Sequence, residues 1–151
     1  MTVWNLLLFL VSDPFAVMNT IGLVAFALVG SSKAIREEFD LLGIAIVGLA
    51  MAFAGGVTRD ILVRRVPLAL RSPIEITLGL VGVLLAIGLR VVLQSPDEHP
   101  ITLLADAIGL AAFATTGAIV GIEAGVSAFG VVAIATINAV GGGAFADILL
   151  D

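Results

Sequence analysis

Apolar residues run along the chain in long stretches that charged residues rarely interrupt. The hydrocarbon core of a bilayer is about 30 Å thick, and a helix needs about 20 apolar residues to cross it. Five stretches reach or approach this length when long flanking side chains such as Arg90 extend toward the headgroups. The pattern predicts five spans, at about residues 14–33, 39–65, 73–93, 102–122 and 126–149.

The connections between these stretches carry the charged and helix-breaking residues. All five prolines lie at the ends of the predicted spans or between them, where proline begins or ends a helix. The apolar stretches are too long and too continuous for barrel strands, which alternate over about 10 residues. We therefore predict an all-α membrane protein, a polytopic helical bundle in the cell membrane. Residues 3–11 are too short to span, and Trp4 favours an interfacial position for them.

The amino-acid composition argues against several classes of protein function. Hydrophobic residues make up 60% of the chain and charged residues only 13%, which leaves too little polar surface for a soluble enzyme. A net charge of −5 argues against a nucleic-acid partner, because such proteins present a basic face. One histidine and no cysteine argue against a nucleophile–base pair or a zinc site. We therefore expect no enzyme activity, no cofactor and no bound metal, and a lipid bilayer as partner.

The chain contains an internal repeat. Shifting the sequence by 87 residues aligns residues 19–64 with residues 106–151 without a gap, and 15 of the 46 pairs are identical. The offset encloses three predicted spans, so the second copy enters the bilayer from the opposite side, as in the inverted repeats of many transporters. We assign residues 1–100 to the first three-span repeat with its interfacial segment, and residues 101–151 to the second. The second copy lacks a counterpart of the third span, so we expect the intact protein to contain at least one more.

Glycines are grouped at equivalent places in the second and fifth predicted spans. They are Gly55, Gly56, Gly141, Gly142 and Gly143. A glycine in a helix interior costs about 1 kcal/mol relative to alanine, so adjacent glycines predict kinks or unwound segments. Two such breaks that face each other would place free carbonyl groups around a central pathway. The alternative is that these glycines only allow helices to pack closely.

Polar side chains near these glycines are candidates for a pore or a gate. Asp60 and Asp147 lie one turn past the glycines, where a carboxylate could attract a cation. Arg59 could pair with one of them or act as a movable positive plug. All three could instead be helix-end charges at the membrane surface. Four further side chains could line a polar path, or could only bond to neighbouring helices or extend toward the headgroups: Lys33, Thr115, Thr116 and Asn138.

The chain resembles the prokaryotic trimeric intracellular cation (TRIC) channel family in residues 54–62, Ala-Gly-Gly-Val-Thr-Arg-Asp-Ile-Leu, and in their echo at residues 141–149. Residues 13–15 and the stretch 21–30 are similar to the same family. The resemblance implies a seven-span protomer, a homotrimer, and one pore per protomer for K⁺ and Na⁺, framed by spans two and five, which are kinked at the five glycines. The second copy departs from the pattern, because Ala146-Asp147 stands where the first copy has Arg59-Asp60.

These observations predict a monovalent-cation channel for K⁺ or Na⁺, with a pore inside each protomer. Bacterial relatives with the same duplicated domain are described as glycine transporters, so secondary transport of a small zwitterion such as glycine is the alternative. A membrane assembly protein, in which the glycines only pack helices, is the third possibility.

Overall fold

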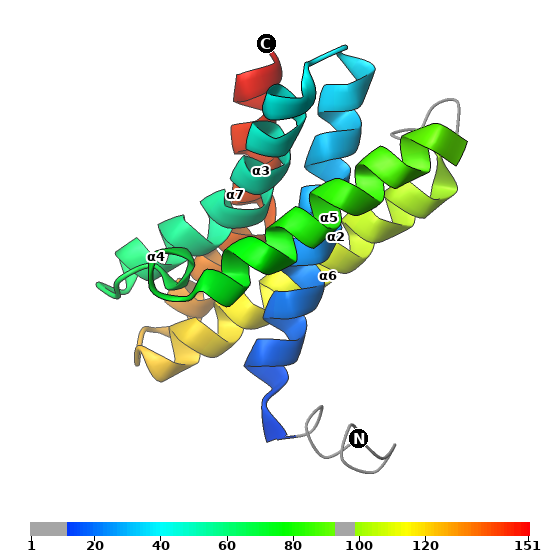
Figure 1. The fold of residues 1–151 in the computed structure, drawn as a ribbon. Helices are drawn as coiled ribbons and strands as arrows, with labels where there is room; N and C mark the ends of the chain where they lie inside the picture. Colours follow the sequence, from blue (N-terminus) through cyan, green and yellow to red (C-terminus); the bar gives the residue numbers. More distant parts are fainter. Residues whose placement is uncertain (1–11, 93–98) are drawn as a thin grey trace.

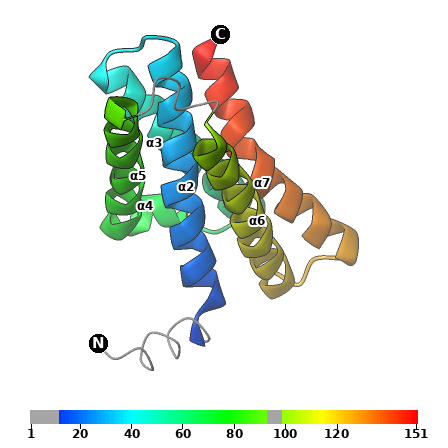
Figure 2. The same cartoon turned by 90° about the vertical axis from the view of Figure 1, so that its right-hand side faces the viewer.

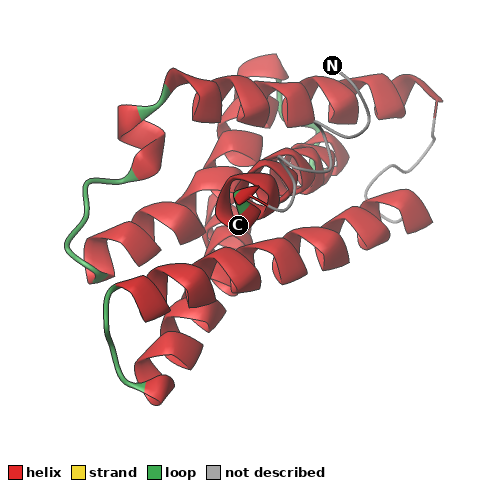
Figure 3. Ribbon diagram, turned by 90° about the horizontal axis from the view of Figure 1, so that it is seen from below, coloured by secondary structure: helices red, strands yellow, loops and turns green. Residues whose placement is uncertain are grey.

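The computed structural model describes residues 12–92 and 99–151 (Figure 1). Its helices are α2 (Pro14–Arg36), α3 (Leu41–Leu62), α4 (Leu68–Arg71), α5 (Pro73–Val92), α6 (Pro100–Glu123) and α7 (Ala128–Leu150). Within the described residues every regular element is helical (Figure 3). All of these helices except the short α4 are long and apolar enough to cross a membrane. Their bounds confirm the five predicted spans to within three residues at each end. The interfacial position expected for residues 3–11 lies outside the described residues.

The same kind of cap starts the two helices that carry the glycine groups. At the start of α3, Asp40 Oδ1 accepts a hydrogen bond from the backbone N–H of Gly43 at 2.7 Å. At the start of α7, Ser127 Oγ accepts one from the backbone N–H of Gly130 at 3.2 Å. Each cap satisfies an N–H group that has no partner inside the helix. Asp40 and Ser127 are equivalent under the 87-residue offset, so both copies of the repeat begin this span in the same way.

Helix α2 lies at the centre of the bundle. It packs against α3, α5 and α6, and Figure 2 shows it between α5 on one side and α6 and α7 on the other. Within its apolar window 67% of the residues are buried, compared with 22–33% in the other four spans. The outer helices therefore leave much of their apolar surface unburied within the protein, where lipid chains are the favourable contact. Arg90, which we expected to extend toward the headgroups, donates from Nη1 to the carbonyl oxygen of Ile35 at 3.1 Å, near the end of α2.

The two copies of the repeat meet through equivalent residues of α2 and α6. The rings of Phe26 and Phe113 are in edge-to-face contact, with centroids 5.0 Å apart. Phe113 also covers Gly22, and Phe26 covers Gly109, so that a Cβ on either glycine would clash with the ring. These residues pair under the 87-residue offset, so the contacts are reciprocal and the pseudo-two-fold axis passes between the two helices. Figure 1 shows α3 and α7 running in opposite directions, as inverted repeats require.

Candidate functional site

Helices α3 and α7 cross at the glycines. A Cβ on Gly55 would clash with the carbonyl oxygen of Asn138, and a Cβ on Gly142 would clash with the carbonyl oxygen of Met51. Met51 and Asn138 are equivalent under the offset, as are the two glycines, so these contacts are related by the pseudo-two-fold axis. A Cβ on Gly141 would lie 3.2 Å from Gly55 Cα. Glycine at these three positions lets the two backbones touch, as small residues do between membrane helices.

The glycine segments do not unwind. Both α3 and α7 stay helical through their glycines, and Figure 1 shows that α3 changes direction partway along its length. The unwound segment that we predicted as one possibility is therefore not observed, and a kink at the glycines themselves stays a prediction. Gly56 and Gly143 lie outside the close contact. A Cβ on Gly143 would meet nothing within 4 Å, and one on Gly56 would meet only Arg59 Nη2, at 3.8 Å.

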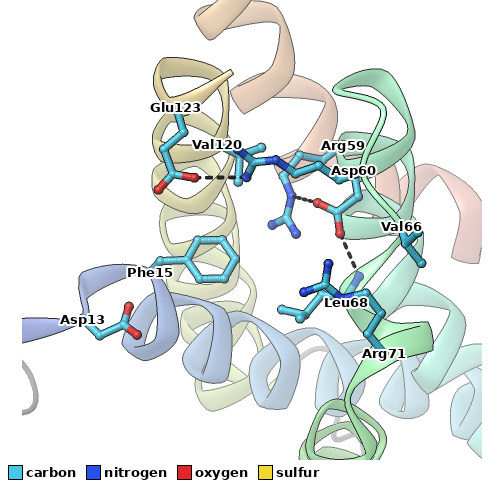
Figure 4. A pocket seen from close by; sticks show the side chains of 10 residues that line it. Asp13, Phe15, Arg59, Asp60, Val66, Leu68, Arg71, Val120 and Glu123 are labelled. Carbon is cyan, nitrogen blue, oxygen red and sulfur yellow. Dashed lines mark hydrogen bonds and ion pairs between the residues drawn. The ribbon is translucent and has the colours of Figure 1, made fainter. Parts of the chain in front are cut away.

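A cavity of about 420 Å³ lies past the glycines, at the end of α3. Figure 4 shows the side chains that line it and the helices from which they come. The start of α2 contributes Phe15, the end of α3 contributes Arg59 and Asp60, α4 contributes Arg71, and the end of α6 contributes Glu123. Three helix ends and a short connecting helix therefore bring charges of both signs to one place.

Arg59 and Asp60 form a buried ion pair in the wall of this cavity. Arg59 Nε donates to Asp60 Oδ1 at 2.8 Å, and the two residues are only 2% and 4% exposed. Asp60 Oδ2 accepts from the backbone N–H of Leu68 at 2.9 Å, which ties α3 to α4. The guanidinium carbon of Arg59 lies 5.3 Å from the centroid of the Phe15 ring, a cation–π contact. The pair lies in the last turns of α3 and is buried within the protein, so its two charges solvate each other in place of water.

Asp147, the equivalent of Asp60, pairs differently at the opposite end of the crossing. Its Oδ1 accepts from Lys33 Nζ at 2.8 Å, so the basic partner comes from α2 and not from the neighbouring residue. The side chains of Lys33 and Asp147 are 31% and 65% exposed. Asp106 on α6 lies within electrostatic reach of both charges. One cation and two carboxylates therefore gather at this end, and Lys33 does more than extend toward the headgroups.

The polar residues of α6 and α7 bond between and within helices. Asn138 Nδ2 donates to the carbonyl oxygen of Phe113 at 2.6 Å and to Thr116 Oγ1 at 2.9 Å. Thr116 Oγ1 also donates to the Phe113 carbonyl, at 3.1 Å. Thr115 Oγ1 donates to the carbonyl oxygen of Ala111, one turn earlier, at 2.8 Å. Asn138 and Thr116 thus fasten α7 to α6 beside the crossing, while Thr115 bonds to its own helix.

Two further side-chain contacts were not found by sequence reasoning. Glu75, in the first turn of α5, accepts from Asn19 Nδ2 with both carboxylate oxygens, at 3.1 and 2.9 Å, and both residues are buried. Glu123 Oε2, at the end of α6, accepts from Arg65 Nη1, in the connection after α3, at 3.0 Å, and both residues line the cavity. In the sequence, Glu75 lies near the start of the third predicted span and Glu123 directly follows the fourth. These positions suggest that each acid needs a partner, but they do not predict which residue it is.

The reciprocal contacts between opposed helices and the outward apolar faces define a multi-pass membrane protein built from inverted helical repeats. The model of the family described as Glycine transporter matches residues 16–90 and 103–151. The chain belongs to this family. A UPF0126 membrane protein of Deinococcus radiodurans is 36% identical over 135 residues, which cover 89% of this chain and 62% of that protein. The chain thus spans less than two thirds of the length of this relative.

Solved structures of TRIC channels share the fold. The crystal structure of a prokaryotic TRIC channel in 0.5 M KCl aligns with a TM-score of 0.84 and 29% identity, over 93% of this chain and 72% of that one. The TRIC orthologue from Rhodobacter sphaeroides aligns with a TM-score of 0.84 and 27% identity, over 91% of this chain and 71% of that one. The resemblance seen in the sequence is therefore confirmed at the level of the fold.

Proposed function

We propose that the protein is a monovalent-cation channel, with K⁺ or Na⁺ as the permeant ions and one pore in each protomer of a homotrimer. The observation that carries this proposal is the similarity of the fold to crystal structures of TRIC channels, at a TM-score of 0.84. The charged cavity beside the α3–α7 crossing is consistent with it, because carboxylate side chains are one of the linings by which channels favour cations.

The proposed path passes the α3–α7 crossing between two ends that carry equivalent carboxylates. Asp60 lies at one end and Asp147 at the other, and each would favour a passing cation. Each is also neutralised by a basic side chain, Arg59 or Lys33. The glycine backbones touch at the crossing itself. This arrangement corresponds to a closed channel, and opening would require Arg59 to leave the cavity wall or the two helices to separate.

Recording from a planar bilayer tests the proposal. The full-length protein, reconstituted between unequal KCl solutions, is expected to give unitary current steps that reverse near the K⁺ equilibrium potential. Stepwise currents exclude an alternating-access carrier, which moves too few charges per cycle to be resolved singly. Saturable glycine uptake into vesicles without any unitary steps would refute the channel.

Opposite effects are expected when the two members of the Lys33–Asp147 pair are neutralised separately. Lys33→Gln leaves the carboxylates of Asp147 and Asp106 without their cation, so unitary K⁺ conductance should rise. Asp147→Asn removes a carboxylate from the same mouth, so conductance should fall. Recording in about 0.01 M salt, where the Debye length is about 30 Å, maximises both effects.

The matched control for this pair is Arg36→Gln. Arg36 is exposed at the same end of α2 but pairs with Glu37, so its loss should leave conductance nearly unchanged. If Lys33→Gln and Asp147→Asn changed conductance in the same direction, the ion pair would only fasten α2 to α7, and it would not form part of the path.

Removal of the buried charge pair is expected to raise the open probability. The double variant Arg59→Gln/Asp60→Asn keeps polar side chains of similar size but removes the positive charge that the proposed path must pass. Single-channel open probability is the measurement, and size-exclusion chromatography verifies folding. A folded double variant with the open probability of the parent protein would assign this pair to structure and not to gating.

Secondary transport of a small zwitterion such as glycine is the second candidate function. The family description supports it, and so does a specific feature of the cavity. Asp13 and Arg71 both line the cavity, and neither forms an ion pair with another described residue. A cavity with unpaired charges of opposite sign is complementary to a zwitterion. Saturable uptake of radiolabelled glycine by vesicles that contain the protein is the measurement for this function.

A further inference from the structure

An open apolar groove of about 460 Å³ lies between α3, α5 and α7. A stripe of α3 from Leu49 to Thr58 lines it, together with Ile76 of α5 and Phe145 of α7. Ile76 and Phe145 are 46% and 47% exposed, so the groove opens toward the lipid that surrounds the spans. Among the described residues it shares no lining residue with the charged cavity. The groove is therefore a separate feature that the proposed ion path does not use.

The chemistry and the length of the groove match a hydrocarbon chain. Its lining is apolar except for Thr58, whose hydroxyl donates to the carbonyl oxygen of Ala54 at 2.8 Å. The stripe from Leu49 to Thr58 covers nine residue steps of a helix, which is about 14 Å long. Half of the hydrocarbon core of a bilayer is about 15 Å thick. The groove therefore has the depth that the acyl chains of one leaflet occupy.

The connection between α3 and α5, residues 63–72, lies at one end of the groove. Thr58 is in the last turns of α3, and Ile76 is in the first turn of α5. Figure 1 shows α4, which belongs to this connection, where the two helix ends meet. The connection contains three arginines and no acidic residue. Because α3 and α5 are both long enough to span, this positive segment lies at the depth of the lipid headgroups.

Arg64 continues the face of α3 that lines the groove. Its backbone N–H donates to the carbonyl oxygen of Ile61 at 3.0 Å, so Arg64 lies one turn past Ile61. Ile61 is 60% exposed and follows Val57 by four residues, the spacing of one helix face. The Arg64 side chain is exposed and makes no hydrogen bond or ion pair with another described residue. Arg65 and Arg71 line the charged cavity instead.

We propose that the groove binds an acyl chain of an anionic phospholipid, whose phosphate pairs with Arg64. Guanidinium groups bind phosphate oxygens through charge-assisted hydrogen bonds, often two at once. The nearest acids in the sequence, Asp60 and Glu75, are buried and bonded to other side chains. They therefore do not neutralise Arg64, and a lipid with a net negative charge is preferred over a zwitterionic one. This site depends on neither conduction nor glycine transport.

Native mass spectrometry of the full-length protein in detergent measures the binding of individual lipids. The ligands are phosphatidylglycerol, phosphatidylcholine with the same oleoyl chains, and glycerophosphoglycerol, which is the first headgroup without chains. Phosphatidylglycerol is expected to bind at least about fivefold more tightly than phosphatidylcholine. Glycerophosphoglycerol should bind at least about tenfold more weakly than phosphatidylglycerol, because it cannot fill the groove. Equal affinities for the two lipids, or for phosphatidylglycerol and its bare headgroup, would refute the proposal.

Two arginine variants test the contact with the headgroup. Arg64→Gln keeps a long polar side chain but removes the charge, so it should weaken phosphatidylglycerol about fivefold. Arg71→Gln is the matched control, because Arg71 is exposed on the same connection but lines the charged cavity. It should weaken phosphatidylglycerol less than about twofold, since salt screens a charge that makes no contact. Equal losses in the two variants would contradict the assignment of the phosphate to Arg64.

Two tryptophan variants test the groove. Ile76→Trp is expected to fill its headgroup end and to weaken both lipids about tenfold. Ile74→Trp is the matched control, because Ile74 is 67% exposed in the same turn of α5 but does not line the groove. It should leave both affinities unchanged, and equal effects of the two variants would overturn the proposal. Size-exclusion chromatography gives the oligomeric state in parallel. If Ile76→Trp dissociated the oligomer and left lipid binding unchanged, a second copy of the chain would cover the groove, and the lipid site would be wrong.

Discussion

Replacement of Gly55 or Gly142 by alanine is expected to destabilise the protein severely, because each added methyl group would meet a backbone carbonyl of the opposite helix. A side chain in the way can change its rotamer, but a carbonyl moves only if the helix moves. Overpacking of a tight interior usually costs about 1–3 kcal/mol and sometimes more. With a backbone as the obstacle, we expect about 3 kcal/mol for each variant. The measurement is the midpoint of thermal unfolding in detergent, followed by size-exclusion chromatography.

Two neighbouring glycines provide controls for this experiment. A Cβ on Gly143 would meet nothing within 4 Å, and one on Gly56 would make an ordinary contact. Alanine is favoured over glycine in a helix by about 0.5–1 kcal/mol, so Gly56→Ala and Gly143→Ala should be neutral or slightly stabilising. A uniform loss across all four variants would contradict the contact explanation. It would indicate that these helices depend on the backbone freedom of glycine instead.

The hydrophobic pattern and the internal repeat predicted most of the fold. The spans followed from the length of the apolar stretches, which the bilayer thickness dictates. The 87-residue offset predicted that equivalent helices oppose each other, and the reciprocal contacts of Phe26 with Gly109 and Phe113 with Gly22 agree with this. When the second copy of a repeat is inverted in the membrane, packing equivalent helices against each other is one of the few arrangements that buries both copies.

The role of the glycines could not be read from the sequence. Helix propensity describes what glycine costs in an isolated helix, so it predicted kinks or unwound segments at the glycine groups, with close helix packing as the alternative. It does not say which glycines face a neighbour. Gly55, Gly141 and Gly142 lie against the opposite backbone, whereas Gly143 meets nothing within 4 Å. Only the crossing of α3 and α7 distinguishes them.

The sequence also did not predict which charged and polar residues pair with each other. Lys33 and Asp147 are 114 residues apart, and Asn19 and Glu75 are 56 residues apart. The repeat predicts an acid at equivalent places in α3 and α7, but it does not predict that one pairs with its neighbour and the other with α2. Arg59 has alanine as its counterpart in the second copy. The symmetry of the backbone is therefore broken by side chains, and side chains decide which end of the crossing is buried.

This broken symmetry leads to a second large expected effect, the loss of stability in Asp60→Ala. Arg59 would keep its charge inside the protein with its ion-pair partner gone, and removal of one partner of a buried pair costs about 3–5 kcal/mol. The backbone N–H of Leu68 would also lose its acceptor. The double variant Arg59→Met/Asp60→Leu removes both charges and should be considerably more stable than Asp60→Ala, because an apolar pair of similar volume requires no compensation.

Asp147→Ala is the repeat-matched control for Asp60→Ala, since the two acids occupy equivalent positions on α3 and α7. The Asp147 side chain is 65% exposed, and exposed ion pairs contribute little because water solvates both partners after the pair is broken. The unfolding midpoint should therefore fall steeply for Asp60→Ala and hardly at all for Asp147→Ala. Equal shifts would mean that both ends of the crossing are equally accessible to water. In that case Arg59 would not be a buried charge, and the closed-channel interpretation of the Arg59–Asp60 pair would lose its physical basis.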